Sequence, residues 1–291
     1  MKNLNLKLKH LNWLKSIGIE YYCSYGQKDR KKNLIDAVKD LNKKIEQRLS
    51  TVDTCSDLTE NEGQYINKIR EYNVPKKTIS TNLPQNIQES VAKARALADK
   101  ANDIGELRLA VENFDGCELK QFAMNTVFAA GVLPAQILLV GEAPGETEDR
   151  LAIPFCGESG KLLDEMLKSI GISRMTNAYI TNTVFWRPPA NRKPTNEEIA
   201  ICKPFVEKHV ALVKPKLIIL VGSTACTSLL GKNEAMATIR IGDYQYSNPY
   251  LEKTIPTTII FHPAYLLRQP NKKKDTWFDL LKIKNLIESL T

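Results

Sequence analysis

Four aliphatic runs in the second half of the chain each lead into residues that could do chemistry. The runs are Ile137–Val140, Ala178–Thr181, Leu217–Val221 and Thr257–Phe261. After them, in the same order, come a carboxylate, a carboxamide, a Gly-Ser pair and a histidine, namely Glu142, Asn182, Gly222-Ser223 and His262. With the aromatic Phe155 close behind the first run, this set suits recognition of a planar ring that forms hydrogen bonds.

Several common catalytic signatures are missing from the sequence. It has no obvious nucleophile elbow for a Ser/His/Asp set, no HxxxH metal pair, no Walker loop and no GxGxxG loop. The polar residues that follow the four runs are therefore the candidates for function.

The segments between the aliphatic runs have helical periodicity. Lys161–Ile170 places five apolar residues on one stripe, Thr195–Glu198 forms a capping box, and Ser223–Leu230 is a third helix closed by glycine. This alternation predicts an α/β fold, a three-layer α/β/α sandwich around a mainly parallel four-stranded sheet. Such sheets bind ligands beyond the carboxyl ends of their strands, where the polar residues would meet.

The N-terminal part of the chain differs in charge from the rest. We predict an extension of helical or uncertain structure over residues 1–105 and a catalytic domain over residues 106–291. Residues 1–100 contain 19 Lys+Arg and 12 Asp+Glu, a balance of +7, whereas the whole chain carries +8. The basic excess therefore belongs to the extension, where a solvated or partner-binding segment is favoured over a catalytic one.

The apolar runs and the cysteines limit the cellular compartments in which we expect the protein. The longest apolar runs have the length of strands, so we expect no membrane span, and polar residues interrupt the leucines of the N-terminus, which argues against a signal peptide. The six cysteines lie far apart and form no CxxC pair. Reduced thiols in the cytoplasm are the expectation.

The stretch at residues 140–149 (VGEAPGETED) resembles the first motif of family 4 uracil-DNA glycosylases, the iron–sulfur bacterial type. Further motifs follow in that family's order: PFCG at 154–157, LLD at 162–164, YITN at 179–182, RPPANR at 187–192 and FHPA at 261–264. The resemblance covers roughly residues 107–288. It leaves the N-terminal hundred residues outside.

The resemblance implies roles for the polar residues. Phe155 would stack on an extruded uracil, and Asn182 would accept from N3–H and donate to O4. His262 would donate to O2, where charge accumulates as uracil leaves. Glu142 and the backbone of Ala143 would position the attacking water, although the related family with the GQDPY motif has an aspartate at the position of Ala143, so the water-activating group stays open.

The resemblance also implies residues that would select the base and contact the DNA. Glu148 would crowd the C5 position and exclude thymine, and Leu266 or Tyr265 would fill the space that the flipped base leaves. Four basic residues are candidates for phosphate contacts as well as for solvated surface, namely Arg187, Arg192, Lys193 and Arg268.

The resemblance also implies a [4Fe–4S] cluster with four cysteine ligands, and here the chain departs from the family. The ligand positions read Phe114, Cys117, Trp186 and Cys202. Two thiolates do not satisfy a cluster that takes four. We therefore expect no cluster and no metal, with Phe114 and Trp186 packing against the same loop.

The resemblance identifies the chain as a monofunctional DNA glycosylase that removes uracil from single- or double-stranded DNA and leaves an abasic site. One alternative is a glycosylase for another deaminated base such as hypoxanthine. A second is a catalytically silent, DNA-binding or polymerase-associated module on the same fold. We expect a monomer, with the basic N-terminal region available to a repair or replication partner.

Overall fold

The structure, a computed structural model, describes residues 83–290, and the predictions for residues 1–82 lie outside that range. Six strands form one sheet: β1 (Ala130–Gly131), β2 (Ile137–Gly141), β3 (Ala178–Asn182), β4 (Leu217–Val221), β5 (Tyr244–Tyr246) and β6 (Ile255–Ile260). Their order across the sheet is β1-β3-β2-β4-β6-β5.

The four central strands are parallel, as the sequence predicts. β2 pairs with β3 and with β4, and β4 pairs with β6. The prediction of four strands was wrong in number, because β1 and β5 pair antiparallel at the two edges. These edge strands have two and three residues, too few to give an alternating pattern that sequence analysis can detect.

Three helices cover one face of the sheet: α8 (Glu158–Lys168), α12 (Pro263–Arg268) and α13 (Lys273–Leu290). The predicted stripe of α8 points inward, since Leu163 and Met166 are fully buried in a cluster with Leu139 of β2 and Leu280 of α13. Residues of β2 alternate between the two faces, so Leu138 belongs to the cluster on the opposite side.

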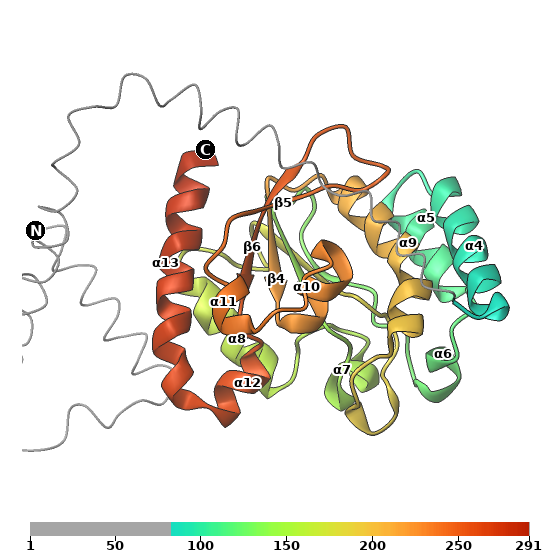
Figure 1. Ribbon diagram of the computed structural model, residues 1–291, viewed down its shortest axis with the longest axis horizontal. Helices are drawn as coiled ribbons and strands as arrows, with labels where there is room; N and C mark the ends of the chain where they lie inside the picture. Colours follow the sequence, from blue (N-terminus) through green and yellow to red (C-terminus); the bar gives the residue numbers. More distant parts are fainter. Residues whose placement is uncertain (1–82, 291) are drawn as a thin grey trace, which may run out of the picture. The chain divides into compact units, whose positions relative to one another are not determined.

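On the opposite face lie α9 (Asn196–Val213) and α10 (Ser223–Leu230), and beyond them α4 (Gln85–Lys100) and α5 (Ile104–Glu112) (Figure 1). α4 packs on α9 and buries Ala94 and Ala98 completely. The predicted domain boundary near residue 105 is therefore misplaced. α4 and the start of α5 belong to the same core as α9.

Short helices complete the part of the chain that the structure describes: α6 (Leu119–Phe122), α7 (Glu146–Leu151), α11 (Met236–Ile239), η2 (Pro189–Asn191) and η3 (Pro270–Lys272). Among residues 83–290, no helix is both long and apolar enough to cross a bilayer.

The predicted helix ends have identifiable causes. Thr195 and Glu198 form the capping box at the start of α9, because the Thr195 hydroxyl accepts from the Glu198 amide at 3.2 Å while the Glu198 carboxylate accepts from the Thr195 amide at 2.7 Å. α10 ends at Gly231, whose φ of +65° suits glycine. The helix has the predicted bounds, Ser223–Leu230, and its N-cap is Gly222.

His209 of α9 is a titratable residue in the core. Its ring stacks on Phe128 at 4.5 Å between centroids and meets the edge of Tyr179 at 5.3 Å. Neither ring nitrogen has a hydrogen-bond partner among residues 83–290. Burial therefore disfavours the charged ring and lowers the pKa of His209 from 6.5 to about 3.

This burial predicts acid sensitivity of the fold. As the pH falls from 6.5 towards 3, the unfolded chain binds a proton at His209 that the folded chain does not, so the free energy of unfolding falls by up to about 1.4 kcal/mol per pH unit. Denaturant titrations of the wild type and His209→Gln at pH 7, 6, 5 and 4 test this. The variant, which has no titrating ring, should lose less stability on acidification, and parallel pH profiles would contradict the assignment.

Candidate active site

The register of the sheet brings the four strand ends to one edge. Gly141 of β2 pairs with Asn182 of β3, and Val221 of β4 pairs with Ile260 of β6. Glu142 directly follows β2, and His262 lies two residues after the end of β6. The predicted convergence of polar residues at the carboxyl ends of the strands is therefore present.

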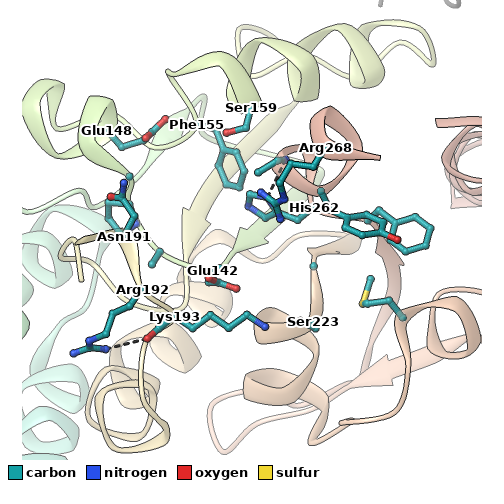
Figure 2. A pocket seen from close by; sticks show the side chains of 18 of the residues that line it. Glu142, Glu148, Phe155, Ser159, Asn191, Arg192, Lys193, Ser223, His262 and Arg268 are labelled. Atoms are coloured by element: carbon teal, nitrogen blue, oxygen red, sulfur yellow. Dashed lines mark hydrogen bonds between the residues drawn. The ribbon is translucent and has the colours of Figure 1, made fainter. Parts of the chain in front are cut away.

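A cavity of about 770 Å³ opens at this edge. Figure 2 shows Glu142, Phe155 and His262 pointing into the same space from three separate segments. Eight of the predicted site residues line the cavity, namely Glu142, Ala143, Glu148, Phe155, Arg192, Lys193, His262 and Arg268, and Tyr265 lines it too. Asn182, Arg187 and Leu266 are not part of its wall.

Asn182 is buried beside the cavity. Its side chain is 1% exposed, and its amide oxygen has no hydrogen-bond donor within residues 83–290. A Cβ on Gly141 would lie 2.4 Å from that oxygen and 2.5 Å from the ring of Phe155, so glycine is what lets the amide and the ring approach together. A buried acceptor without a donor costs roughly 1–3 kcal/mol, which a ligand donor could recover.

His262 is arranged as a hydrogen-bond donor. Its Nδ1 accepts from the amide of Ala264 at 3.2 Å, so in the neutral ring the hydrogen is on Nε2. Burial lowers the pKa of His262, with opposing and weaker effects from Glu142 and Glu148. The ring is therefore neutral at pH 7 and lies 5.6 Å from the ring of Phe155.

Two threonines that the sequence analysis missed hold Glu142. The hydroxyl of Thr224, in the first turn of α10, donates a short hydrogen bond to the Glu142 carboxylate. The hydroxyl of Thr183 donates to the Glu142 backbone carbonyl at 2.5 Å. The carboxylate is thus fixed at the cavity wall, and the spacing between residues 142 and 224 is too long for a local motif to reveal this contact.

Comparison with known proteins agrees with this geometry. A family model described as the uracil DNA glycosylase superfamily matches residues 128–282. The type-4 uracil-DNA glycosylase of Sulfurisphaera tokodaii is 39% identical over 174 residues, covering 58% of this chain and 78% of that protein. That of Thermotoga maritima is 36% identical over 181 residues, covering 61% and 91%. The chain belongs to the type-4 uracil-DNA glycosylase family.

A third protein that is similar to this chain is much larger than the chain itself. The DNA polymerase of Bacillus phage SP01 is 29% identical over 173 residues, which cover 60% of this chain and 18% of the polymerase. A domain of this kind is therefore also found within a polymerase chain.

Glu148 has a contact that the sequence analysis did not foresee. One carboxylate oxygen accepts from the amides of Cys156 at 3.0 Å and Gly157 at 2.7 Å. Glu148 lines the cavity and also holds the backbone next to Phe155. Its role at the C5 position of a base stays a prediction.

The predicted wedge at Leu266 was wrong. Leu266 is 0% exposed and packs in the core beneath α12, so it cannot reach DNA while the helix is folded. Tyr265 lines the cavity and remains a candidate, and the neighbouring Leu267 is 46% exposed.

The four basic residues fall into two kinds. Arg192 forms two bonds to Glu198, at 2.9 and 2.6 Å, and Arg187 lies 3.5 Å from Glu146. Lys193 and Arg268 line the cavity and have no salt bridge within residues 83–290. The last two are the better candidates for contacts with phosphates.

The positions implied as cluster ligands come together in the core around α9. Phe114 and Trp186 are 3% and 1% exposed, and Cys117 and Cys202 are buried with them. Phe114 meets Phe205 edge-on at 5.2 Å, and the Trp186 indole donates to Thr126 at 2.9 Å.

The two thiols contact each other in this core. A hydrogen bond with Cys202 lowers the pKa of Cys117, while burial raises the pKa of Cys202. No group of three or more His, Cys, Asp or Glu side chains suited to a metal occurs in the described part of the chain. Two thiols among packed aromatic rings do not fit a four-cysteine cluster.

The Thr224 contact predicts a change in catalysis. Thr224→Val should lower kcat about tenfold with little change in KM, because the Glu142 carboxylate loses the donor that orients it while Phe155, Asn182 and His262 stay in place. Thr224→Ser should keep most of the activity. Single-turnover kinetics on uracil-containing DNA measure both.

Thr227→Val is a matched control on the same helix. Its hydroxyl can donate to the backbone carbonyl of Lys232 at 2.9 Å or of Ser223 at 3.1 Å, and within residues 83–290 it forms no hydrogen bond with Glu142. Equal losses of kcat in both valine variants would show that the effect comes from α10 in general.

Proposed function

We propose that this chain is a monofunctional uracil-DNA glycosylase that hydrolyses the N-glycosidic bond of uracil in DNA. The products are free uracil and an abasic site. The observation that carries the proposal is the buried Asn182 amide oxygen without a donor, beside the Phe155 ring and the neutral His262, in a member of the type-4 family.

The amide reads the base. Its oxygen accepts from N3–H of uracil and its NH₂ donates to O4, while the Phe155 ring stacks on the face of the base. Cytosine presents an acceptor at N3 and a donor at N4, so the same amide orientation would leave its groups unmatched. Selectivity follows from the penalty for burying unpaired polar groups.

The chemistry needs a stabilised leaving group and a placed water. His262 donates from Nε2 to O2, where negative charge develops as the C1′–N1 bond breaks. Glu142, held by Thr224, positions the water that attacks C1′. The oxygen of this water bonds to C1′ and keeps one proton as a hydroxyl group. The other proton of the water is transferred to the departing uracil.

The base must leave the duplex stack before it reaches the cavity, at a cost of roughly a few kcal/mol. Lys193 and Arg268 contact the flanking phosphates, and Tyr265 fills the space left in the stack. These contacts carry no sequence information. The proposed substrates are single- and double-stranded DNA that contain uracil.

The protein works without an iron–sulfur cluster. Support comes from Phe114 and Trp186, which occupy two ligand positions as buried, packed aromatic rings. The reaction itself requires no redox step, so a core of aromatic residues can take the place of the cluster.

A second candidate function is a catalytically silent DNA-binding module associated with replication. The relative within the phage polymerase favours it. Four further properties remain predictions: that the protein is cytoplasmic, that it is a monomer, that it is bacterial and that its basic N-terminal region binds a partner. Excision of hypoxanthine in place of uracil is less favoured, because the Asn182 amide matches the N3–H and O4 pair of uracil.

The decisive measurement is alkali-labile cleavage of oligonucleotides that carry a single uracil, hypoxanthine or thymine. The wild type should cleave at uracil in preference to the other two. Asn182→Ala and His262→Ala should each lower the rate about 10²- to 10³-fold, because each removes a hydrogen bond made to the base in the transition state. Lesion binding by the wild type without abasic sites would support the silent module.

Metal analysis tests the proposed absence of the cluster. Protein purified without oxygen should contain no stoichiometric iron or sulfide and should lack visible absorbance. Four irons per chain would contradict the proposal. As a control, restoring the ligands with Phe114→Cys and Trp186→Cys asks whether the scaffold can still accept a cluster.

A further inference from the structure

The loop between α7 and α8 carries Phe155 in an uncommon backbone conformation. Its φ is +51°, in the left-handed region that bulky residues rarely adopt. A Cβ on Gly160 would lie 1.9 Å from the Phe155 carbonyl oxygen, so the first turn of α8 packs directly against this peptide. Such a conformation persists only where the surroundings hold it.

Arg174 binds the carbonyl side of this loop. Its Nη1 donates to the Pro154 carbonyl at 2.8 Å and its Nη2 to the Phe155 carbonyl at 2.9 Å. Its Nε donates to Asp164 of α8 at 2.9 Å. The side chain is 14% exposed, so the planar guanidinium is fixed between α8 and the loop.

Glu148 binds the amide side of the same loop through the two amides that follow Phe155. The peptides on both sides of Phe155 are therefore anchored, the carbonyls by a cation and the amides by an anion. Charged partners make these hydrogen bonds stronger than neutral ones.

We propose that Arg174 is a positioning residue for base recognition, because it fixes the backbone from which the Phe155 ring reaches the cavity. Arg174 does not line the cavity, so it acts through Phe155 and not by touching the substrate. The inference rests on the proposed function, in which the ring stacks on uracil. A ring that is already held loses less freedom when the base arrives, and a misplacement of about 1 Å can cost on the order of 10²-fold in rate.

A double-mutant cycle separates positioning from general stabilisation. Arg174→Met should lower kcat/KM on uracil-containing DNA about 10- to 100-fold. Phe155→Ala should lower it as well, and the double variant should lie within about twofold of Phe155→Ala alone, because Arg174 has no ring left to position. Arg174→Lys, which keeps the charge but lacks the planar fork, should have intermediate activity.

Arg108→Met is the matched control. Arg108 forms a surface salt bridge with Glu112 on α5 and lies outside the cavity lining, so its loss should leave kcat/KM unchanged. If Arg174→Met does not fold, as judged by thermal melting, the same cycle is run with Arg174→Lys. Full additivity with Phe155→Ala in the folded variant would overturn the proposal.

Hydrogen exchange of the free protein gives a readout that does not depend on activity. In Arg174→Met, amides of the segment 153–160 should exchange faster, while those of α9 should not change. Unchanged exchange in the segment would overturn the proposal even if activity falls. If the wild type releases no uracil, the proposed function fails by itself, and the exchange measurement still decides whether Arg174 holds the loop.

Discussion

The parallel pairing of β2 with both β3 and β4 is the constraint on which the site depends. Parallel strands end at the same edge, and the register sets Gly141 directly opposite Asn182. A slip of one residue would turn the buried amide to the other face of the sheet. The pairing also requires crossover helices, and these bring the Phe155 loop and the start of α10 to the same edge. The fold thus sets the backbone positions of residues 142, 182 and 262 at one edge of the sheet, whatever side chains they carry.

Close packing of the backbone then decides which side chains can meet. Gly141 leaves room for the Asn182 amide beside the Phe155 ring, and Gly160 leaves room for the Phe155 carbonyl. Gly222, with a φ of +92°, lies where a Cβ would be 3.0 Å from the Cβ of His262. At these points the absence of a side chain has a steric reason. Polar contacts, such as that of Thr224 with Glu142, complete the arrangement.

The sequence predicted the elements whose cause is local. The central strands, the capping box at Thr195 and the stripe of α8 follow from periodicity and capping within a few residues. The edge strands β1 and β5 were missed because each depends on a neighbouring strand. Leu266 was misassigned because one residue turns a helix by about 100°, which separates a buried leucine from its exposed neighbour Leu267. The contacts of Arg174 were missed because they form only in the folded chain.

The core around α9 brings together the four positions at which the resemblance implies cluster ligands. The four positions lie on three segments that a cluster would cross-link, and here buried side chains join the same segments. An aromatic side chain buries about 150–250 Å², and at roughly 25 cal/mol per Å² this contributes a few kcal/mol for each of Phe114 and Trp186. The Trp186 indole also keeps a hydrogen bond, to Thr126, so no polar group of the ring is left buried without a partner. This core adjoins the cavity: Ala143, next to Glu142, lines the cavity and packs against the core. Val184, Phe185 and Trp186 of the core follow shortly after Asn182. The packing of these aromatic residues therefore supports the backbone from which the cavity wall is built.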